Sequence, residues 1–292
     1  MTPAEGFVRA NGIDVHYVQW GDDAAPPLLA VHPTGFLSWT WAPVAERLAA
    51  RWRVVATDQR GHGDSAKPGD GYDFETFARD LQGLIEALDL RDPVAVGHSS
   101  GATTLVVHAA LFPGVLRALA LVEPIIPRPE WRSPPPGEPA RSAHDMRELA
   151  LRRRAVWDSP RAMFASFRSR PPFASWTDDA LRSYAEHGLA PRSDGRFELK
   201  CPPALEAKFY EAVAHLDPAP YLARVTCPVL ILWGAESELA RDGFVRRIHH
   251  AFASATTRIL DGMTHFAPME RPDVVAEEIE RFFTRGASGA IP

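Results

Sequence analysis

Residues 96–102 have the sequence Val96-Gly97-His98-Ser99-Ser100-Gly101-Ala102, in which a serine lies between two glycines. The apolar run Pro93-Val94-Ala95-Val96 precedes it, and a helix-forming run over residues 102–112 follows. In a G-x-S-x-G turn between a strand and a helix, the serine takes a strained backbone conformation and the glycines leave room for it. The pattern predicts a nucleophile elbow that lifts the Ser99 hydroxyl clear of a sheet.

A serine nucleophile needs a base, and a suitable histidine occurs near the C-terminal end of the sequence. The strand-like run Thr257-Arg258-Ile259-Leu260 is followed by the loop Asp261-Gly262-Met263-Thr264-His265-Phe266. A histidine on a loop at the end of a strand can reach the Ser99 hydroxyl and accept its proton. We therefore expect His265 to be the general base.

The acid that orients this histidine is less clearly marked. A buried-strand pattern over residues 228–234 leads into the loop Ala235-Glu236-Ser237-Glu238-Leu239-Ala240. Three residues after the glycine that ends the strand, where an aspartate is expected, the sequence has Ser237. We expect Glu238 to be the acid, because a longer side chain can still reach a histidine Nδ1, and Glu236 is the less favoured choice in this loop.

A third carboxylate is the alternative acid. Residues 117–122 form another buried-strand pattern, and Glu123 follows directly, at the sheet edge where the active site is expected. From that side Glu123 could also orient His265. Whichever glutamate is not the acid is expected to support a loop through hydrogen bonds.

An oxyanion needs backbone N–H donors. One is expected from Ser100, at a helix N-terminus, where unpaired amides and the helix dipole favour negative charge. The second is expected from the loop His32-Pro33-Thr34-Gly35-Phe36, which follows a strand-like run. Proline has no N–H. Thr34 is therefore the better donor, and Phe36 stays open if the loop turns differently.

Together these residues resemble the α/β-hydrolase superfamily over nearly the whole chain. The segment Asp58-Gln59-Arg60-Gly61-His62-Gly63-Asp64-Ser65 is similar to the D-x-R-G-x-G-x-S loop of that family, which we interpret as architectural. Two features depart from the family pattern: the usual His-Gly pair is His32-Pro33, and the acid is displaced and is a glutamate. The Glu123 position matches the alternative acid of some haloalkane dehalogenases, but those enzymes use an aspartate nucleophile.

The resemblance implies an α/β fold with a mainly parallel eight-stranded sheet, helices on both faces and a helical cap insertion. The sequence itself supports an antiparallel start, because Asn11-Gly12 is a strong type I′ hairpin signal. Buried strands then alternate with amphipathic helices, for example over residues 74–88, as in a parallel sheet covered on both sides.

This alternation stops between residues 124 and 222. A proline-rich segment over residues 127–139 comes first, and the rest shows helix-like patterns without a convincing strand; the expected helices cover residues 144–157, 160–168, 177–188 and 203–214. We therefore expect a core of residues 1–123 and 223–292, with a cap or lid over residues 124–222.

Aromatic residues are expected to line a substrate pocket beneath this cap. The candidates for direct contact are Phe36, Trp39, Phe173, Trp176 and Phe266. Most of the other aromatic residues of the insertion are expected to form its core; they are Trp131, Trp157, Phe164, Phe167, Phe209 and Tyr210.

Composition excludes several other classes of protein. The 292 residues carry a formal net charge of −5 with scattered basic residues, which does not fit nucleic-acid binding. We interpret Arg152-Arg153-Arg154 as a solvated helix face. No apolar run reaches the length of a membrane span and the N-terminus does not resemble a leader, so we expect a cytoplasmic protein. Cys201 and Cys227 fit free thiols better than a metal site, although a disulfide between them stays open.

The sequence thus predicts an acyl hydrolase that needs no cofactor or metal. Its expected substrate is a small or medium, apolar carboxylic ester, cleaved through an acyl-enzyme on Ser99. Lactones, amides and carbon-carbon bonds stay open for the same residues, as does a non-catalytic ligand receptor. We expect no nucleic-acid or membrane partner, and a homodimer stays open.

Overall fold

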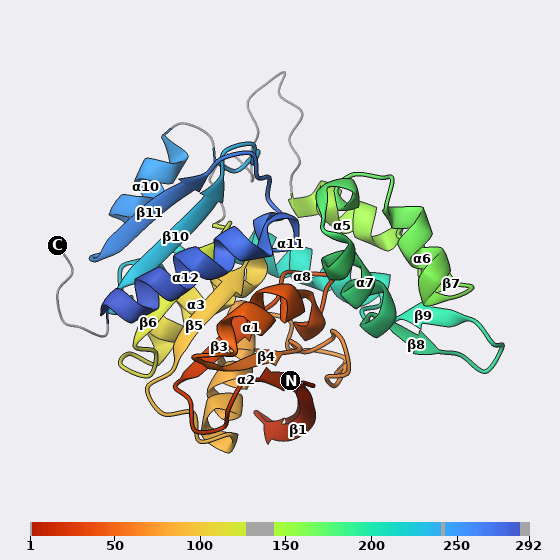
Figure 1. Cartoon of the computed structure of the whole chain (residues 1–292), viewed down its shortest axis with the longest axis horizontal. Coiled ribbons are helices and arrows are strands. Elements are labelled where there is room, and N and C mark those ends of the chain that lie inside the picture. The colour runs from red at the N-terminus through yellow and green to blue at the C-terminus, as the bar shows by residue number, and fades with distance from the viewer. Residues whose placement is uncertain (1, 127–142, 241–242, 287–292) are drawn as a thin grey trace.

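The computed structural model describes residues 2–126, 143–240 and 243–286, and these form an eight-stranded sheet with helices on both faces (Figure 1). The strand order is β1-β2-β4-β3-β5-β6-β10-β11. The strands are β1 (Ala4–Ala10), β2 (Ile13–Trp20), β3 (Pro27–Val31), β4 (Arg53–Thr57), β5 (Val94–His98), β6 (Ala118–Val122), β10 (Val229–Gly234) and β11 (Ala255–Leu260). Strand β2 is antiparallel to β1 and β4, and all other neighbouring strands are parallel. The predicted, mainly parallel sheet is therefore confirmed.

The predicted hairpin opens the sheet. Strands β1 and β2 pair with Ala10 opposite Ile13, and the two residues between them, Asn11 and Gly12, have φ values of 46° and 80°. A type I′ turn requires positive φ at both central positions, which asparagine and glycine tolerate. The hairpin prediction is therefore confirmed.

Each face of the sheet buries its own apolar cluster, because successive strand residues point to opposite sides. Leu28 and Ala30 of β3 pack with α1 (Ala42–Leu48) and α12 (Pro272–Gly286). Leu29 and Val31 pack on the other face; the helices there are α2 (Phe74–Ala87), α3 (Ser100–Leu111), α9 (Ala219–Leu222) and α10 (Phe244–His250). Burial on both faces explains why these strands are continuous apolar runs.

The chain between β6 and β10 leaves the sheet, and its residues 143–222 are called the insertion below. Figure 1 shows most of it as a separate lobe beside the sheet. Its long helices are α5 (Ala143–Leu151), α6 (Pro160–Phe167), α7 (Asp178–His187) and α8 (Pro203–His215). The last three lie close to their predicted ranges, but the helix predicted over residues 144–157 ends at Leu151, and Trp157 lies in a strand. Trp131 and the proline-rich segment lie outside the described residues.

The expectation that this region has no strand is wrong. A three-stranded antiparallel sheet joins β7 (Val156–Trp157), β9 (Phe197–Leu199) and β8 (Leu189–Pro191) in that order. Strands of two or three residues are too short to show the alternation of apolar and polar residues by which a strand is recognised.

Among the described helices, none is long and apolar enough to cross a membrane.

A buried ion pair joins the loop after β4 to α2. Arg60 Nε and Nη2 lie 2.6 and 2.7 Å from the two carboxylate oxygens of Asp80, and both side chains are about 95% buried. The Asp80→Asn variant leaves the Arg60 guanidinium without its counter-charge, so we expect the free energy of unfolding to fall by about 3–5 kcal/mol.

Urea unfolding followed by circular dichroism measures this loss. The control is Glu277→Gln, which breaks an exposed ion pair with Arg281, for which we expect a change below about 0.5 kcal/mol. Equal effects of the two variants would show that the buried pair contributes no more than a surface one.

Candidate active site

The Ser99 turn has the strained geometry that its sequence predicts. Ser99 lies between β5 and α3 with backbone angles φ 56° and ψ −119°, a conformation that residues other than glycine rarely adopt. A Cβ on Gly97 would lie 2.6 Å from the Ala102 Cα, and one on Gly101 would lie 2.4 Å from the Val31 carbonyl oxygen. Both glycines are therefore required by close backbone packing, and they hold the elbow at the carboxyl end of β5.

Ser99, His265 and Glu123 form a continuous hydrogen-bonded line. The Ser99 Oγ lies 3.1 Å from His265 Nε2, and His265 Nδ1 lies 3.2 Å from Glu123 Oε2. Glu123 is fully buried, whereas the His265 side chain is 25% exposed. With neutral His265, Nδ1–H donates to the carboxylate, and Nε2 accepts from the serine hydroxyl. A base with this orientation can accept the Ser99 proton.

The carboxylate that contacts His265 is the alternative acid, Glu123, and the preference for Glu238 is corrected. The Glu238 side chain lies on the exposed part of the loop after β10, and Glu236 is exposed as well. Strands β6 and β10 are neighbours, with Val122 opposite Leu232, so a residue that directly follows β6 can reach this loop from the side.

Ser237, at the position where an aspartate was expected, helps to hold Glu123. Its hydroxyl donates a hydrogen bond of 2.6 Å to Glu123 Oε2, and the Gly234 amide donates one of 2.6 Å to Glu123 Oε1. The position at which an aspartate was expected thus supplies a donor that holds the glutamate. Glu123 itself has φ 51°, a strained conformation that turns its side chain beneath His265.

The loop after β3 lies beside the elbow, as the oxyanion prediction requires. Thr34 Oγ1 donates to Ser100 Oγ at 2.8 Å and joins the two segments. The Gly35 amide donates to His62 Nε2, and the Phe36 amide to the Pro33 carbonyl oxygen. Within residues 2–126, 143–240 and 243–286, the amides of Thr34 and Ser100 donate no hydrogen bond to the protein. They are thus the two amides of the predicted set that can serve an oxyanion.

Comparison with known proteins identifies the family to which this arrangement belongs. Residues 28–278 match the sequence profile described as the alpha/beta hydrolase family. The chain is a member of the α/β hydrolase family.

Two curated relatives of this hydrolase span most of its length. One is a 2-(acetamidomethylene)succinate hydrolase from Mesorhizobium japonicum, 29% identical over 259 residues that cover 89% of this chain and 88% of the relative. Another is a bifunctional esterase/perhydrolase from Acinetobacter calcoaceticus, 27% identical over 80% of this chain and 83% of the relative. Among solved structures, E-2-(acetamidomethylene)succinate hydrolase superposes with a TM-score of 0.84 at 25% identity, over 97% of this chain and all of that one.

Buried histidines support the catalytic loops of the hydrolase without carrying charge. His62 accepts from Gly35 through Nε2, while His32 contacts the Pro33 carbonyl oxygen through Nδ1 at 2.7 Å and accepts from the Gln59 amide through Nε2. Burial lowers the pKa of both imidazoles, that of His62 well below its usual value. Neutral rings of fixed tautomer can each offer one donor and one acceptor, which is what this loop uses.

His98, inside the elbow, was not singled out by the sequence. Its Nε2 lies 2.8 Å from the His265 carbonyl oxygen, so it supports the loop that carries the base. Burial, followed by the proximity of His265, lowers the pKa of His98 well below its usual value, so the ring is a neutral donor through Nε2.

Four of the five predicted pocket residues lie together, and one of them, Phe266, packs edge-on against His265 at 5.2 Å between ring centroids. Trp176 is 5.5 Å from Phe266 and 5.0 Å from Phe173 between ring centroids, and Phe36 packs against all three. Trp39 packs against the same apolar cluster, but its ring contacts are with His187, on which it stacks at 3.6 Å, and with Trp20, edge-on. Tyr184, which the sequence analysis did not select, packs against Phe36 at 4.8 Å.

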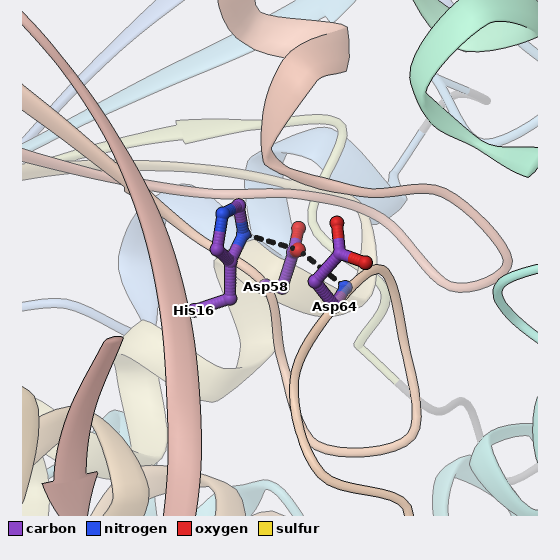
Figure 2. Close-up of side chains that lie close together, drawn as sticks. All are labelled: His16, Asp58 and Asp64. Carbon is purple, nitrogen blue, oxygen red and sulfur yellow. Dashed lines mark hydrogen bonds and ion pairs between the residues drawn. The ribbon is translucent and has the colours of Figure 1, made fainter. Parts of the chain in front are cut away.

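The family loop after β4 and strand β2 together carry a group with metal-ligand spacing. Figure 2 shows His16, Asp58 and Asp64, whose possible ligand atoms lie within 4.8 Å of one another. Asp58 accepts hydrogen bonds from His16 Nδ1 and the Asp64 amide on one oxygen and from the Ser38 amide on the other. The Asp64 carboxylate pairs with Lys200 at 2.5 Å. These donors fit a hydrogen-bonded brace, as predicted for this loop, better than a cation site.

The interpretation of Arg152-Arg153-Arg154 as a solvated helix face is wrong for its central residue. Helix α5 ends at Leu151, and the turn that follows directs the Arg153 side chain inward, where it is 17% exposed. Its guanidinium pairs with Glu206 at 2.6 Å. A run of three charges carries no information about which one a turn will bury, so only the tertiary structure separates them.

Proposed function

We propose that this α/β hydrolase cleaves carboxylic esters of small to medium apolar acids through an acyl-enzyme on Ser99. The observation that carries the proposal is the line from Ser99 through His265 to Glu123, with two bonds of 3.1 and 3.2 Å. The first is within the range of a nucleophile-base hydrogen bond and the second is at its upper limit. The esterase activity named for the Acinetobacter relative supports the same reaction class.

In the proposed acylation, Ser99 Oγ attacks the ester carbonyl carbon while His265 Nε2 accepts the hydroxyl proton. The carbonyl oxygen becomes an oxyanion, which the amides of Thr34 and Ser100 stabilise. The carbonyl carbon then releases the alcohol oxygen, which takes the proton back from His265. Glu123 stays ionised throughout and stabilises the imidazolium between the two steps.

Deacylation repeats these roles with water as the nucleophile. His265 removes a proton from water as its oxygen attacks the acyl carbon, and the same two amides hold the second oxyanion. The bond to Ser99 Oγ breaks, the proton returns to the serine, and a carboxylic acid leaves. Each step uses only groups of this chain and water.

The aromatic cluster supports the choice of an apolar acyl group. Phe36 and Phe266 come from loops of the core, while Phe173 and Trp176 come from the insertion; the four rings form one cluster, which contacts the base through Phe266. We propose that residues 124–222 form a cap over a core of residues 1–123 and 223–292, and that these rings enclose the acyl chain at the boundary.

Hydrolysis of p-nitrophenyl esters from acetate to laurate tests this function. We expect turnover, with the highest kcat/KM at a short or medium chain, and labelling of Ser99 by a fluorophosphonate, located by peptide mass spectrometry. Labelling without turnover of any ester would reject the esterase and favour lactones, amides or carbon-carbon bonds. A protein that binds esters but shows neither turnover nor labelling would be a ligand receptor.

A further inference from the structure

We propose that Arg153, together with Glu206 and Tyr184, is a positioning group that holds the Thr34 amide in the oxyanion hole. These three residues come from three parts of the insertion: the turn after α5, helix α8 and helix α7. They converge on the backbone of Gly35, the residue after Thr34. The inference rests on the proposed function, because it assigns these residues to the same oxyanion.

The contacts to Gly35 are specific. Arg153 Nη1 donates to Glu206 Oε2 at 2.6 Å and to the Gly35 carbonyl oxygen at 3.4 Å. Arg153 Nη2 donates to the Tyr184 hydroxyl, which in turn donates to the same carbonyl oxygen at 3.4 Å. Burial raises the pKa of Tyr184 to about 12, so its hydroxyl keeps the proton that this second bond uses. Two donors of the insertion therefore point at one carbonyl group of the core, each through a long hydrogen bond.

The backbone of Gly35 is held from both sides. Its amide donates to His62 Nε2 at 2.9 Å in the core, while its carbonyl oxygen faces the insertion. Gly35 has φ +81°, and a Cβ there would lie 2.7 Å from Glu206 Oε1. A glycine in this conformation has no side chain to restrict it, so its peptide planes depend on external bonds. The Gly35 carbonyl belongs to the Gly35–Phe36 peptide, so loss of the insertion contacts frees that peptide, and the effect reaches the Thr34 amide through the backbone of Gly35.

Because Arg153 is paired with Glu206, its proposed role is not that of an unpaired cation. The two side chains are 17% and 9% exposed, and the acid neutralises the guanidinium. A buried Arg–Glu pair is weak evidence for stability, so we assign this pair a role in geometry instead. The core holds the Thr34 hydroxyl and the Gly35 amide, whereas the insertion contacts the Gly35 carbonyl oxygen, so the pair makes the oxyanion geometry depend on how the insertion packs on the core.

The test compares Arg153→Met and Tyr184→Phe with the matched control Arg152→Met, which changes the exposed arginine one residue away. The readouts are kcat and KM for the best p-nitrophenyl ester, the inhibition constant of an alkyl boronic acid, and the melting temperature. A boronate adduct on Ser99 places an oxygen in the oxyanion hole, so its affinity reports the position of the donors.

For Arg153→Met we expect kcat to fall about 10- to 100-fold with KM within about threefold, and boronate affinity to fall in parallel. This is less than the roughly 10²- to 10³-fold loss when an oxyanion donor is removed outright. For Tyr184→Phe, which keeps the ring and removes one hydroxyl, we expect about a three- to tenfold loss in both quantities, and for Arg152→Met no change. Arg153→Lys should recover part of the loss.

Three results would overturn the inference alone: unchanged kcat and boronate affinity in Tyr184→Phe, a lower melting temperature with normal kcat, or a higher KM with normal kcat. The second would leave a purely structural role, and the third a substrate contact. If Arg153→Met does not fold, Tyr184→Phe decides. A wild-type protein that neither hydrolyses esters nor reacts with fluorophosphonate would overturn the proposed function and this inference with it.

Discussion

Ester hydrolysis by the Ser99→Ala variant is expected to be about 10⁴- to 10⁶-fold slower in kcat than wild type, because alanine has no group that can form the acyl-enzyme. The folded structure is expected to survive the change. The packing of the flanking glycines sets the φ of 56° at Ser99. The hydrogen bond from the Ser99 backbone N–H to the Val122 carbonyl oxygen does not involve the hydroxyl.

The measurement is single-turnover and steady-state kinetics on the best ester, with fluorophosphonate labelling as a second readout. Ser100→Ala is the control: it keeps the backbone amide and loses only the hydroxyl that accepts from Thr34, so we expect less than a tenfold effect. Hydrolysis that persists in Ser99→Ala at more than a hundredth of the wild-type rate would mean that another group is the nucleophile.

The second large effect is expected for Glu123→Gln, with a fall in kcat of about 10³- to 10⁴-fold. The glutamine carbonyl can still accept from the Gly234 amide, but its NH₂ group would then face His265 Nδ1. That contact favours the tautomer with the proton on Nε2, which cannot accept from Ser99, and it removes the charge that stabilises the imidazolium.

Two variants on the loop after β10 serve as comparisons. For Glu238→Gln we expect less than a threefold change, because its carboxylate lies on the exposed side of the loop. For Ser237→Ala we expect about a tenfold loss, since it removes one of the two donors that hold Glu123. A larger loss in Glu238→Gln than in Glu123→Gln, with both variants folded by circular dichroism, would restore Glu238 as the acid.

The acid shows where reasoning from sequence reaches its limit. Strands β6 and β10 are both apolar runs, and a glutamate follows each of them closely in the sequence. Each glutamate is compatible with a position at the sheet edge. The choice depends on which side chain turns beneath His265, and that follows from the pairing of β6 with β10 and from the φ of 51° at Glu123. Neither quantity has a local sequence signal.

The pocket residues and Arg153 repeat this lesson. Aromatic composition indicated an apolar site, but it did not distinguish Trp39, which was selected, from Tyr184, which was not. Trp39 packs on His187, and Tyr184 packs on Phe36. Arg153 differs from its two neighbours only because the chain turns after α5.

The sequence by itself determined the features that depend on local backbone demands and apolar periodicity. These are the elbow at Ser99, the hairpin at Asn11-Gly12 and the alternation that builds a mainly parallel sheet, because each is enforced by residues close together in the chain. Only the tertiary structure decided that Glu123 contacts His265 and that the insertion reaches Gly35. Those contacts join segments far apart in sequence, and their geometry is set by strand order and helix packing.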